Sequence, residues 1–173
     1  MANNNNSTKV VTGEVRFSYA NVFEPKSING SAEKYSVSIL IDKSDTRTIK
    51  AIEKAVELAK QEGISKFGGK IPSNLKLPLR DGDEDRPDDE NYAGKMFVNA
   101  NSNTKPGIVD KNGTEIIDTT EFYSGCYGKA SINFYAYNTN GNKGIACGLN
   151  NLMKTKDGEA LAGRAKAIDD DLF

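Results

Sequence analysis

A segment of alternating apolar and polar residues constrains the fold of this chain more than any other feature. It runs from Cys126 to Asn138, with the sequence CYGKASINFYAYN. Successive side chains of a β-strand point to opposite faces, so this period of two predicts a long antiparallel strand with one buried face. The residues of the buried phase are Ala130, Ile132, Phe134 and Ala136.

The opposite phase of this strand carries three tyrosines and a lysine, namely Tyr127, Lys129, Tyr135 and Tyr137. Flat rings with a cation beside them suit stacked bases and a phosphate, as on proteins that hold single-stranded nucleic acid. Aromatic residues also favour strands for packing reasons alone, and these rings could instead lie under a loop or a neighbouring strand. The strand by itself leaves both interpretations open.

Composition excludes several classes of site. The chain has 173 residues, which suits one domain, and its 16 glycines indicate a sheet protein rich in turns. It has no histidine and two cysteines, which rules out Ser-His-Asp and Cys-His triads and argues against zinc. We expect no cofactor, no metal and two buried free thiols. No apolar run approaches the roughly 20 residues that cross a bilayer, so we expect no membrane contact.

The net charge of −1 conceals an uneven distribution. Residues 81–90, DGDEDRPDDE, hold seven acids and one arginine, and Asp169, Asp170 and Asp171 form a second acidic run. The remainder holds 22 basic and 14 acidic residues. A basic body with separate acidic segments is compatible with an anionic partner.

Further elements can be read along the chain. Residues 9–23 form a long β-rich run interrupted by Gly13, and Lys34–Ile41 and Lys95–Ser102 read as further strands. Apolar residues at helical spacing predict one helix, capped by Asp42 or Ser44 and ended by Gly63 in a left-handed conformation. Residues 139–144, TNGNKG, predict a hairpin turn that pairs the central strand with residues 144–153.

We expect three regions: a disordered lead-in at residues 1–8, a domain at 9–153 and a flexible acidic tail at 154–173. Within the domain, residues of about 80–92 are expected to form a flexible acidic loop. This loop resembles a calcium loop in charge but lacks the spacing of an EF-hand. The segment Asp169, Asp170, Asp171, Leu172 and Phe173 suits a docking peptide, although a frayed end would have the same composition.

Three blocks of the sequence resemble a known family. They are RFSYANVFEPK at 16–26, KYSVSILIDKSD at 34–45 and FYSGCYGKASINFYAYNTNGNKGIACGLNNLMKTKDGE at 122–159. In these blocks the chain resembles bacteriophage single-stranded DNA-binding proteins of a group formerly described only as a domain of unknown function.

The resemblance implies a mainly β protein with an oligonucleotide-binding (OB) fold, a five-stranded, partly open barrel with one clear helix. It implies sequence-nonspecific binding of single-stranded DNA (ssDNA) in phage replication or recombination, without catalysis, in the cytoplasm of the infected bacterial host. It also implies recruitment of phage or host replication proteins through the acidic tail, and a homodimer would be common for such binders. A simple OB barrel places its helix after three strands, whereas two clear strands precede it here. Either 9–23 folds as two strands about Gly13, or the barrel is elaborated.

The first residues expected to bind ssDNA are Tyr127, Lys129, Tyr135 and Tyr137, followed by Arg16, Tyr19, Lys34, Lys95, Phe97 and Lys143. Two other functions compete with this one. A virion or scaffold protein could use the tyrosine face as a protein interface. A metal-dependent nuclease could use the carboxylates of residues 81–90, although two-metal chemistry needs them held rigidly.

Overall fold

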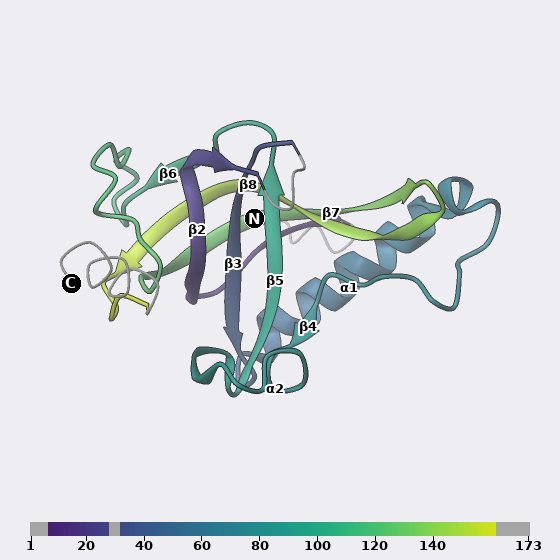
Figure 1. The fold of residues 1–173 in the computed structure, drawn as a ribbon, viewed down its shortest axis with the longest axis horizontal. Helices are drawn as coiled ribbons and strands as arrows, with labels where there is room; N and C mark the ends of the chain where they lie inside the picture. Colours follow the sequence, from purple (N-terminus) through teal and green to yellow (C-terminus); the bar gives the residue numbers. More distant parts are fainter. Residues whose placement is uncertain (1–6, 28–31, 162–173) are drawn as a thin grey trace.

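The computed structural model of the chain describes residues 7–27 and 32–161. In chain order the elements are β1 (Lys9–Val11), β2 (Val15–Lys26), β3 (Lys34–Asp42), α1 (Thr46–Glu62), the 3-10 helix η1 (Ile64–Phe67), β4 (Arg80–Asp81), α2 (Gly82–Asp85), the 3-10 helix η2 (Glu90–Tyr92), β5 (Lys95–Ser102), β6 (Gly107–Val109), β7 (Tyr127–Thr139) and β8 (Asn142–Lys156). Figure 1 shows β2, β3 and β5 side by side, with the β7–β8 hairpin extending past them beside α1.

Hydrogen-bonded pairs link β2, β3, β5, β8 and β7 into a ring. β2 pairs with β3 and β7, β3 pairs with β5, and β7 pairs with β8, all antiparallel. The ring closes through a parallel contact of β5 and β8 at a single residue pair, Asn101 and Gly148. The expected mainly β fold with a partly open barrel is therefore confirmed, and the weak seam between β5 and β8 is the place where the barrel is open.

The segment around β4 fills this seam. Lys76 bridges to Gly144 of β8, and Arg80 of β4 pairs with Phe97 of β5. Residues 76–81 therefore run from one side of the seam to the other. β4, α2 and η2 also show that short regular elements lie within the stretch expected as an acidic loop.

Gly13 separates two strands, as one of the two alternatives required. Val10 and Thr12 are buried whereas Val11 is 64% exposed, so the buried phase shifts before Val15 of β2. β1 pairs with β7 outside the ring. The barrel is elaborated as well, because α1 follows the second strand of the ring, β3, and precedes the third, β5.

Helix α1 packs on β7 through one apolar stripe. Its N-cap is Asp45, whose carboxylate accepts a hydrogen bond of 3.1 Å from the backbone N–H of Thr48, so the expected caps Asp42 and Ser44 were wrong. Gly63 does follow the helix, but with φ of −92° rather than a left-handed conformation. Glycine is required there for space, because a Cβ would lie 2.2 Å from the Cβ of Ala136 on β7.

The main core lies inside the ring and under α1. It contains the predicted buried phase of β7, with Ala130, Ile132, Phe134 and Ala136 all buried. Cys126 and Cys147 are buried free thiols, as expected. A second, smaller cluster lies on the outer face of the sheet, where Leu40 and Phe97 pack with Tyr92. In the described ranges, no helix is long and apolar enough to cross a membrane.

Candidate nucleic-acid interface

Two adjoining hollows form one groove across the outer face of the barrel. The larger, of about 530 Å³, lies between β5 and the β7–β8 hairpin, and the smaller, of about 390 Å³, lies over β2, β3 and β5. They share Lys34, Asn99 and Asn101, so the groove is continuous from β2 to β7. The face that binds oligonucleotides in OB folds is formed by the second and third strands of the barrel, which correspond to β3 and β5 here.

Two of the predicted tyrosines lie at one end of the groove. Tyr135 and Tyr137 of β7 line it, and their partners on β8 are Ala146 and Gly144. Small residues on β8 leave room for the rings: a Cβ on Gly144 would lie 2.6 Å from the Tyr137 hydroxyl, and one on Gly148 would lie 3.5 Å from the Tyr135 ring. Tyr135 remains 42% exposed, so part of its ring is open to a ligand.

The other end of the groove is marked by Tyr19. This residue has φ of +48°, which is uncommon for a bulky residue, and it lies in the irregular stretch of β2 between Ser18 and Asn21. A β-bulge redirects a side chain, and here Tyr19 is 56% exposed and lines the groove. A backbone conformation of this kind is held by its surroundings and is frequent at binding sites.

Arg86 stands beside Tyr19 and fixes this end of the groove. Its guanidinium lies 5.7 Å from the ring centre of Tyr19, 5.1 Å from that of Tyr92 and 6.0 Å from that of Phe97. Phe97 is only 3% exposed and meets Tyr92 edge-on at 5.0 Å. Phe97 therefore supports the groove from below and offers no free face for stacking.

The lining of the groove is strongly one-sided in charge. The described residues that line it include Lys26, Lys34, Arg80 and Arg86, and none of them is Asp or Glu. Lys26 and Lys34 are direct cross-strand partners on β2 and β3. Like charges directly opposite each other are unfavourable. An anion between them would relieve this repulsion.

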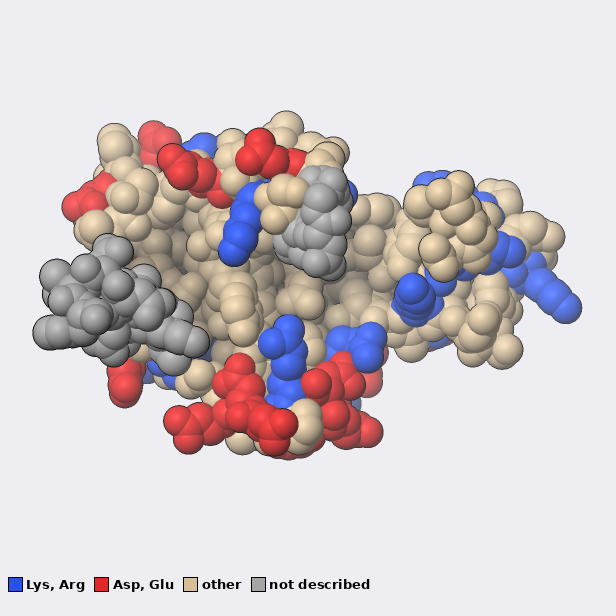
Figure 2. Space-filling model, in the orientation of Figure 1, with Lys and Arg blue, Asp and Glu red and all other residues tan. Residues whose placement is uncertain are grey.

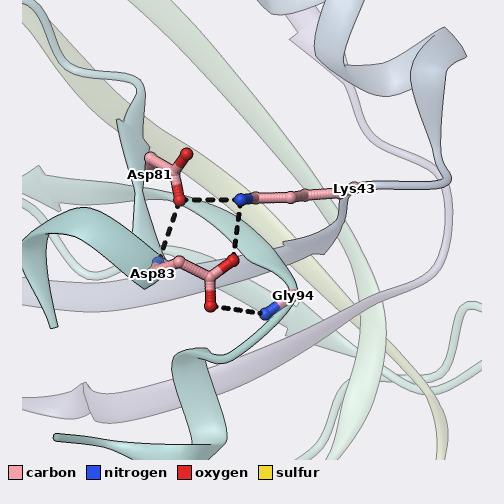
Figure 3. Close-up of polar contacts among 4 residues, drawn as sticks. All are labelled: Lys43, Asp81, Asp83 and Gly94. Carbon is pink, nitrogen blue, oxygen red and sulfur yellow. Dashed lines mark hydrogen bonds and ion pairs between the residues drawn. The ribbon is translucent and has the colours of Figure 1, made fainter. Parts of the chain in front are cut away.

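An ion-pair cluster anchors the acidic segment that carries Arg86 (Figure 3). The ammonium of Lys43 lies 2.9 Å from Asp81 and 2.7 Å from Asp83, and Asp83 also accepts a hydrogen bond of 3.1 Å from the backbone N–H of Gly94. The hydrogen bonds to both carboxylates raise the pKa of Lys43 to about 12, and Lys43 lowers the pKa of Asp81 and of Asp83. Arg80 pairs with Asp85 at 2.5 Å. Within the described part of the chain, no group of His, Cys, Asp or Glu could hold a metal ion.

Acidic side chains gather beside the groove rather than in it. Figure 2 shows them crowded at the lower edge of the molecule over α2, with basic side chains between that edge and the centre. The segment 81–90 thus places its carboxylates at this edge, called the acidic rim, whereas its Arg86 lines the groove.

Several predicted residues lie away from the groove. Tyr127 is at the opposite end of β7, between the cations of Arg16 (5.4 Å) and Lys156 (4.7 Å). Arg16 donates hydrogen bonds to the carbonyls of Gly125 and Glu159, which indicates a structural role. The others outside the lining are Lys129, which is exposed on β7, Lys95, which pairs with Asp42 at 3.3 Å, and Lys143, which donates to the carbonyl of Phe67 at 3.0 Å. Residues 169–173 of the expected tail lie outside the described residues.

The structure brings together Tyr19, Lys34, Tyr135 and Tyr137 of the predicted set. It adds lining residues that sequence reasoning missed: Lys26, Arg80, Arg86, Asn99 and Asn101. A signal existed for the asparagines, because Asn99 and Asn101 share the phase of Phe97 on β5. Arg86 gave no such signal, being the one cation in an acidic run.

Known protein families and proteins include relatives of this chain. A family profile described as "Enterobacter phage Enc34, ssDNA-binding protein" matches residues 8–172. A curated relative, "Putative protein p50" of Acyrthosiphon pisum secondary endosymbiont phage 1, is 32% identical, covering 90% of this chain and 87% of its own.

Two solved structures are similar across the fold. The single-stranded DNA-binding protein from bacteriophage Enc34, solved in complex with ssDNA, superposes with a TM-score of 0.81 at 26% identity over 90% of each chain. Gp2.5, the single-stranded DNA-binding protein of bacteriophage T7, superposes with a TM-score of 0.64 at 16% identity over 93% of each chain, which shows a shared fold. With its profile match over nearly the whole sequence, this chain belongs to the family of the Enterobacter phage Enc34 ssDNA-binding protein.

Proposed function

We propose that this chain binds single-stranded DNA without sequence preference in the groove between Tyr19 and Tyr137. The observation that carries the proposal is the lining itself, which combines exposed tyrosine rings with four cations and no carboxylate among its described residues. Membership in a family of ssDNA-binding proteins, one of them solved with ssDNA, supports it.

The binding mechanism follows from the two kinds of side chain. Tyr19, Tyr135 and Tyr137 offer rings to unpaired bases, and stacking tolerates any base because every base has a flat face. Lys26, Lys34 and Arg86 neutralise phosphates and release counterions, which makes the affinity fall with salt, while Arg80 is already paired with Asp85. A duplex hides its base faces, so this combination selects single strands.

We further propose a non-catalytic role in phage DNA replication or recombination, in the cytoplasm of the infected bacterial host. The carboxylates that a nuclease would need are in part engaged otherwise, since Asp81 and Asp83 contact Lys43 and Asp85 contacts Arg80. The segment 169–173 is proposed to recruit replication proteins, its acids steering and Leu172 and Phe173 anchoring. A chain without residues 168–173 should keep or gain ssDNA affinity and lose any partner that binds the segment.

The decisive test is fluorescence anisotropy of a labelled thymidine 30-mer against a matched duplex, at low and moderate salt without added metal. Salt-sensitive binding of the single strand alone is the expected result. With Lys26, Lys34 and Arg86 on phosphates, log K against log salt should fall with a slope of about −2. Equal failure on both nucleic acids would leave the tyrosine groove as a protein interface, and magnesium-dependent cleavage would establish a nuclease.

A further inference from the structure

Two stretches of this chain contain no acidic residue at all. They are residues 63–80, with Lys66, Lys70, Lys76 and Arg80, and residues 127–156, which form the β7–β8 hairpin. In a chain with 24 acidic residues, two neutral-to-basic stretches of this length concentrate positive charge wherever they meet.

The fold brings these stretches together at the tip of the hairpin. The backbone of Lys76 exchanges hydrogen bonds with β8, donating to the carbonyl of Lys143 (3.1 Å) and accepting from the N–H of Ile145 (2.9 Å). On η1, the Lys66 carbonyl accepts a hydrogen bond of 3.0 Å from the Asn138 side chain. Residues 63–79 and 136–145 therefore form one unit, called the basic lobe below.

The lysines of the basic lobe carry uncompensated charge. Lys66 and Lys143 donate to backbone carbonyls of Ala136 and Phe67, which are neutral acceptors. Lys70 and Lys76 are exposed, and within the described part of the chain neither makes an ion pair. On the neighbouring helix α1, Glu57 is paired with Lys60 at 2.6 Å.

The basic lobe continues the groove. Leu77 and Pro78 line the larger hollow and follow Lys76 directly, while Tyr137 and Thr139 line it from the hairpin whose tip belongs to the lobe. Figure 2 shows the lobe at the right with basic side chains and no acidic ones on this face, whereas the acidic rim lies over α2 below. A strand leaving the groove past Tyr137 thus meets cations in the lobe and carboxylates at the rim.

We propose that the basic lobe is a second, phosphate-binding part of the ssDNA path, which extends the strand beyond the bases stacked in the groove. This inference rests on the proposed function. Apart from Tyr137, which lines the groove, the aromatic residue of the lobe is the buried Phe67. The lysines of the lobe therefore bind the backbone alone and add affinity through counterion release. It acts only on strands longer than the groove holds, so oligonucleotide length separates the two parts of the path.

The test uses the full chain with Lys70→Ala and Lys76→Ala combined, because both side chains are exposed and neither makes a side-chain hydrogen bond or ion pair in the described structure. The matched control combines Lys50→Ala and Lys111→Ala, two exposed lysines on α1 and in the turn after β6. Each protein is titrated with a thymidine 30-mer and with a 6-mer, near the lower end of the roughly 4–16 nucleotides that one OB fold holds. Affinity is measured at several salt concentrations.

The lobe variant should lose about 1.4 from the salt slope for the 30-mer, about 0.7 for each phosphate contact removed. The affinity of the lobe variant for the 6-mer should equal that of the wild type. The control variant should equal the wild type in its affinities and salt slopes for both oligonucleotides. An unchanged 30-mer slope in the lobe variant, while the wild type binds both oligonucleotides, would overturn the lobe and leave the groove intact. An equal loss for the 6-mer would also overturn it, by assigning these lysines to the groove. Failure of the wild type to bind the 6-mer would instead count against the groove itself.

Discussion

Replacing Tyr135 by alanine tests the stacking mechanism most directly. Stacking of one base on an aromatic ring is worth about 1–3 kcal/mol. The Tyr135 ring is 42% exposed and lines the groove, so part of it is open to a base. We expect a loss near the middle of the range, about 2 kcal/mol, which is about 30-fold in Kd.

The same variant should fold normally and keep its salt dependence. A cross-strand aromatic pair contributes about 0.2–1 kcal/mol to stability, so urea unfolding should shift only slightly. Stacking releases no counterions, and the slope of log K against log salt should therefore equal that of the wild type. Anisotropy with the thymidine 30-mer at several salt concentrations measures both quantities.

Two matched variants sharpen the result. Tyr135→Phe keeps the ring and should bind within about twofold of the wild type, because stacking needs the ring and not the hydroxyl. Tyr127→Ala removes a ring that lies between Arg16 and Lys156, outside the groove lining, and should leave the affinity unchanged. The reasoning is refuted if Tyr135→Ala and Tyr137→Ala both bind like the wild type, or if Tyr135→Phe is as weak as Tyr135→Ala.

Three further perturbations follow from the geometry. Lys34→Ala should lower the salt slope by about 0.7 and Lys111→Ala should not; equal slopes would remove Lys34 from the path. Gly144→Ala should cost about 1–3 kcal/mol of unfolding free energy in urea, since a Cβ would lie 2.7 Å from the Lys76 carbonyl oxygen; unchanged stability would show that the segment yields. The lowered pKa of Asp81 and Asp83 stabilises the fold above their ordinary pKa of about 3.9, and this is lost as pH falls through the lowered values. Lys43, with its pKa raised to about 12, contributes fully below its ordinary 10.5 and loses this contribution as pH rises through 12. Lys43→Met should therefore weaken the dependence of the unfolding free energy on pH, both in acid and at high pH. Identical pH profiles of the variant and the wild type would contradict the role of the ion-pair cluster.

The sequence predicted the strands better than the site, for a physical reason. A period of two assigns residues of β7 to one face but does not place them at one location. Tyr127 and Tyr137 share a face yet stand ten positions apart, which is about 33 Å along a strand. Only the end of β7 that faces β5 across the seam reaches the groove, and this depends on the ring topology rather than on local pattern.

Residues such as Arg86 could not be found from local pattern. It is the single cation in an acidic run. Its place at the groove depends on the ion pairs of Asp81 and Asp83 with Lys43, which lies in the turn after β3, 40 positions before Asp83. The aromatic side chain of Phe97 suggested a stacking residue, yet the packing of Tyr92 over it buries the ring. Turn residues can be recognised from local sequence, and the hairpin turn at Asn140 and Gly141, both with positive φ, lies within the predicted segment 139–144.

The single residue pair between β5 and β8 has a consequence for folding and opening. The pairs β2–β3 and β7–β8 each join strands that follow each other in the chain. The ring, by contrast, must be closed by contacts between residues far apart in the chain, such as Val15 with Gly128. Distant closure is slow, because chain entropy is lost before the contacts form. The contact of β5 with β8 has the fewest paired residues of the ring, so we expect the barrel to open there first. A nucleotide strand held by Lys34 and Asn99 on one side and by Tyr135 on the other spans this seam, and bound ssDNA would thus protect the amide hydrogens of β5 and β8 from exchange.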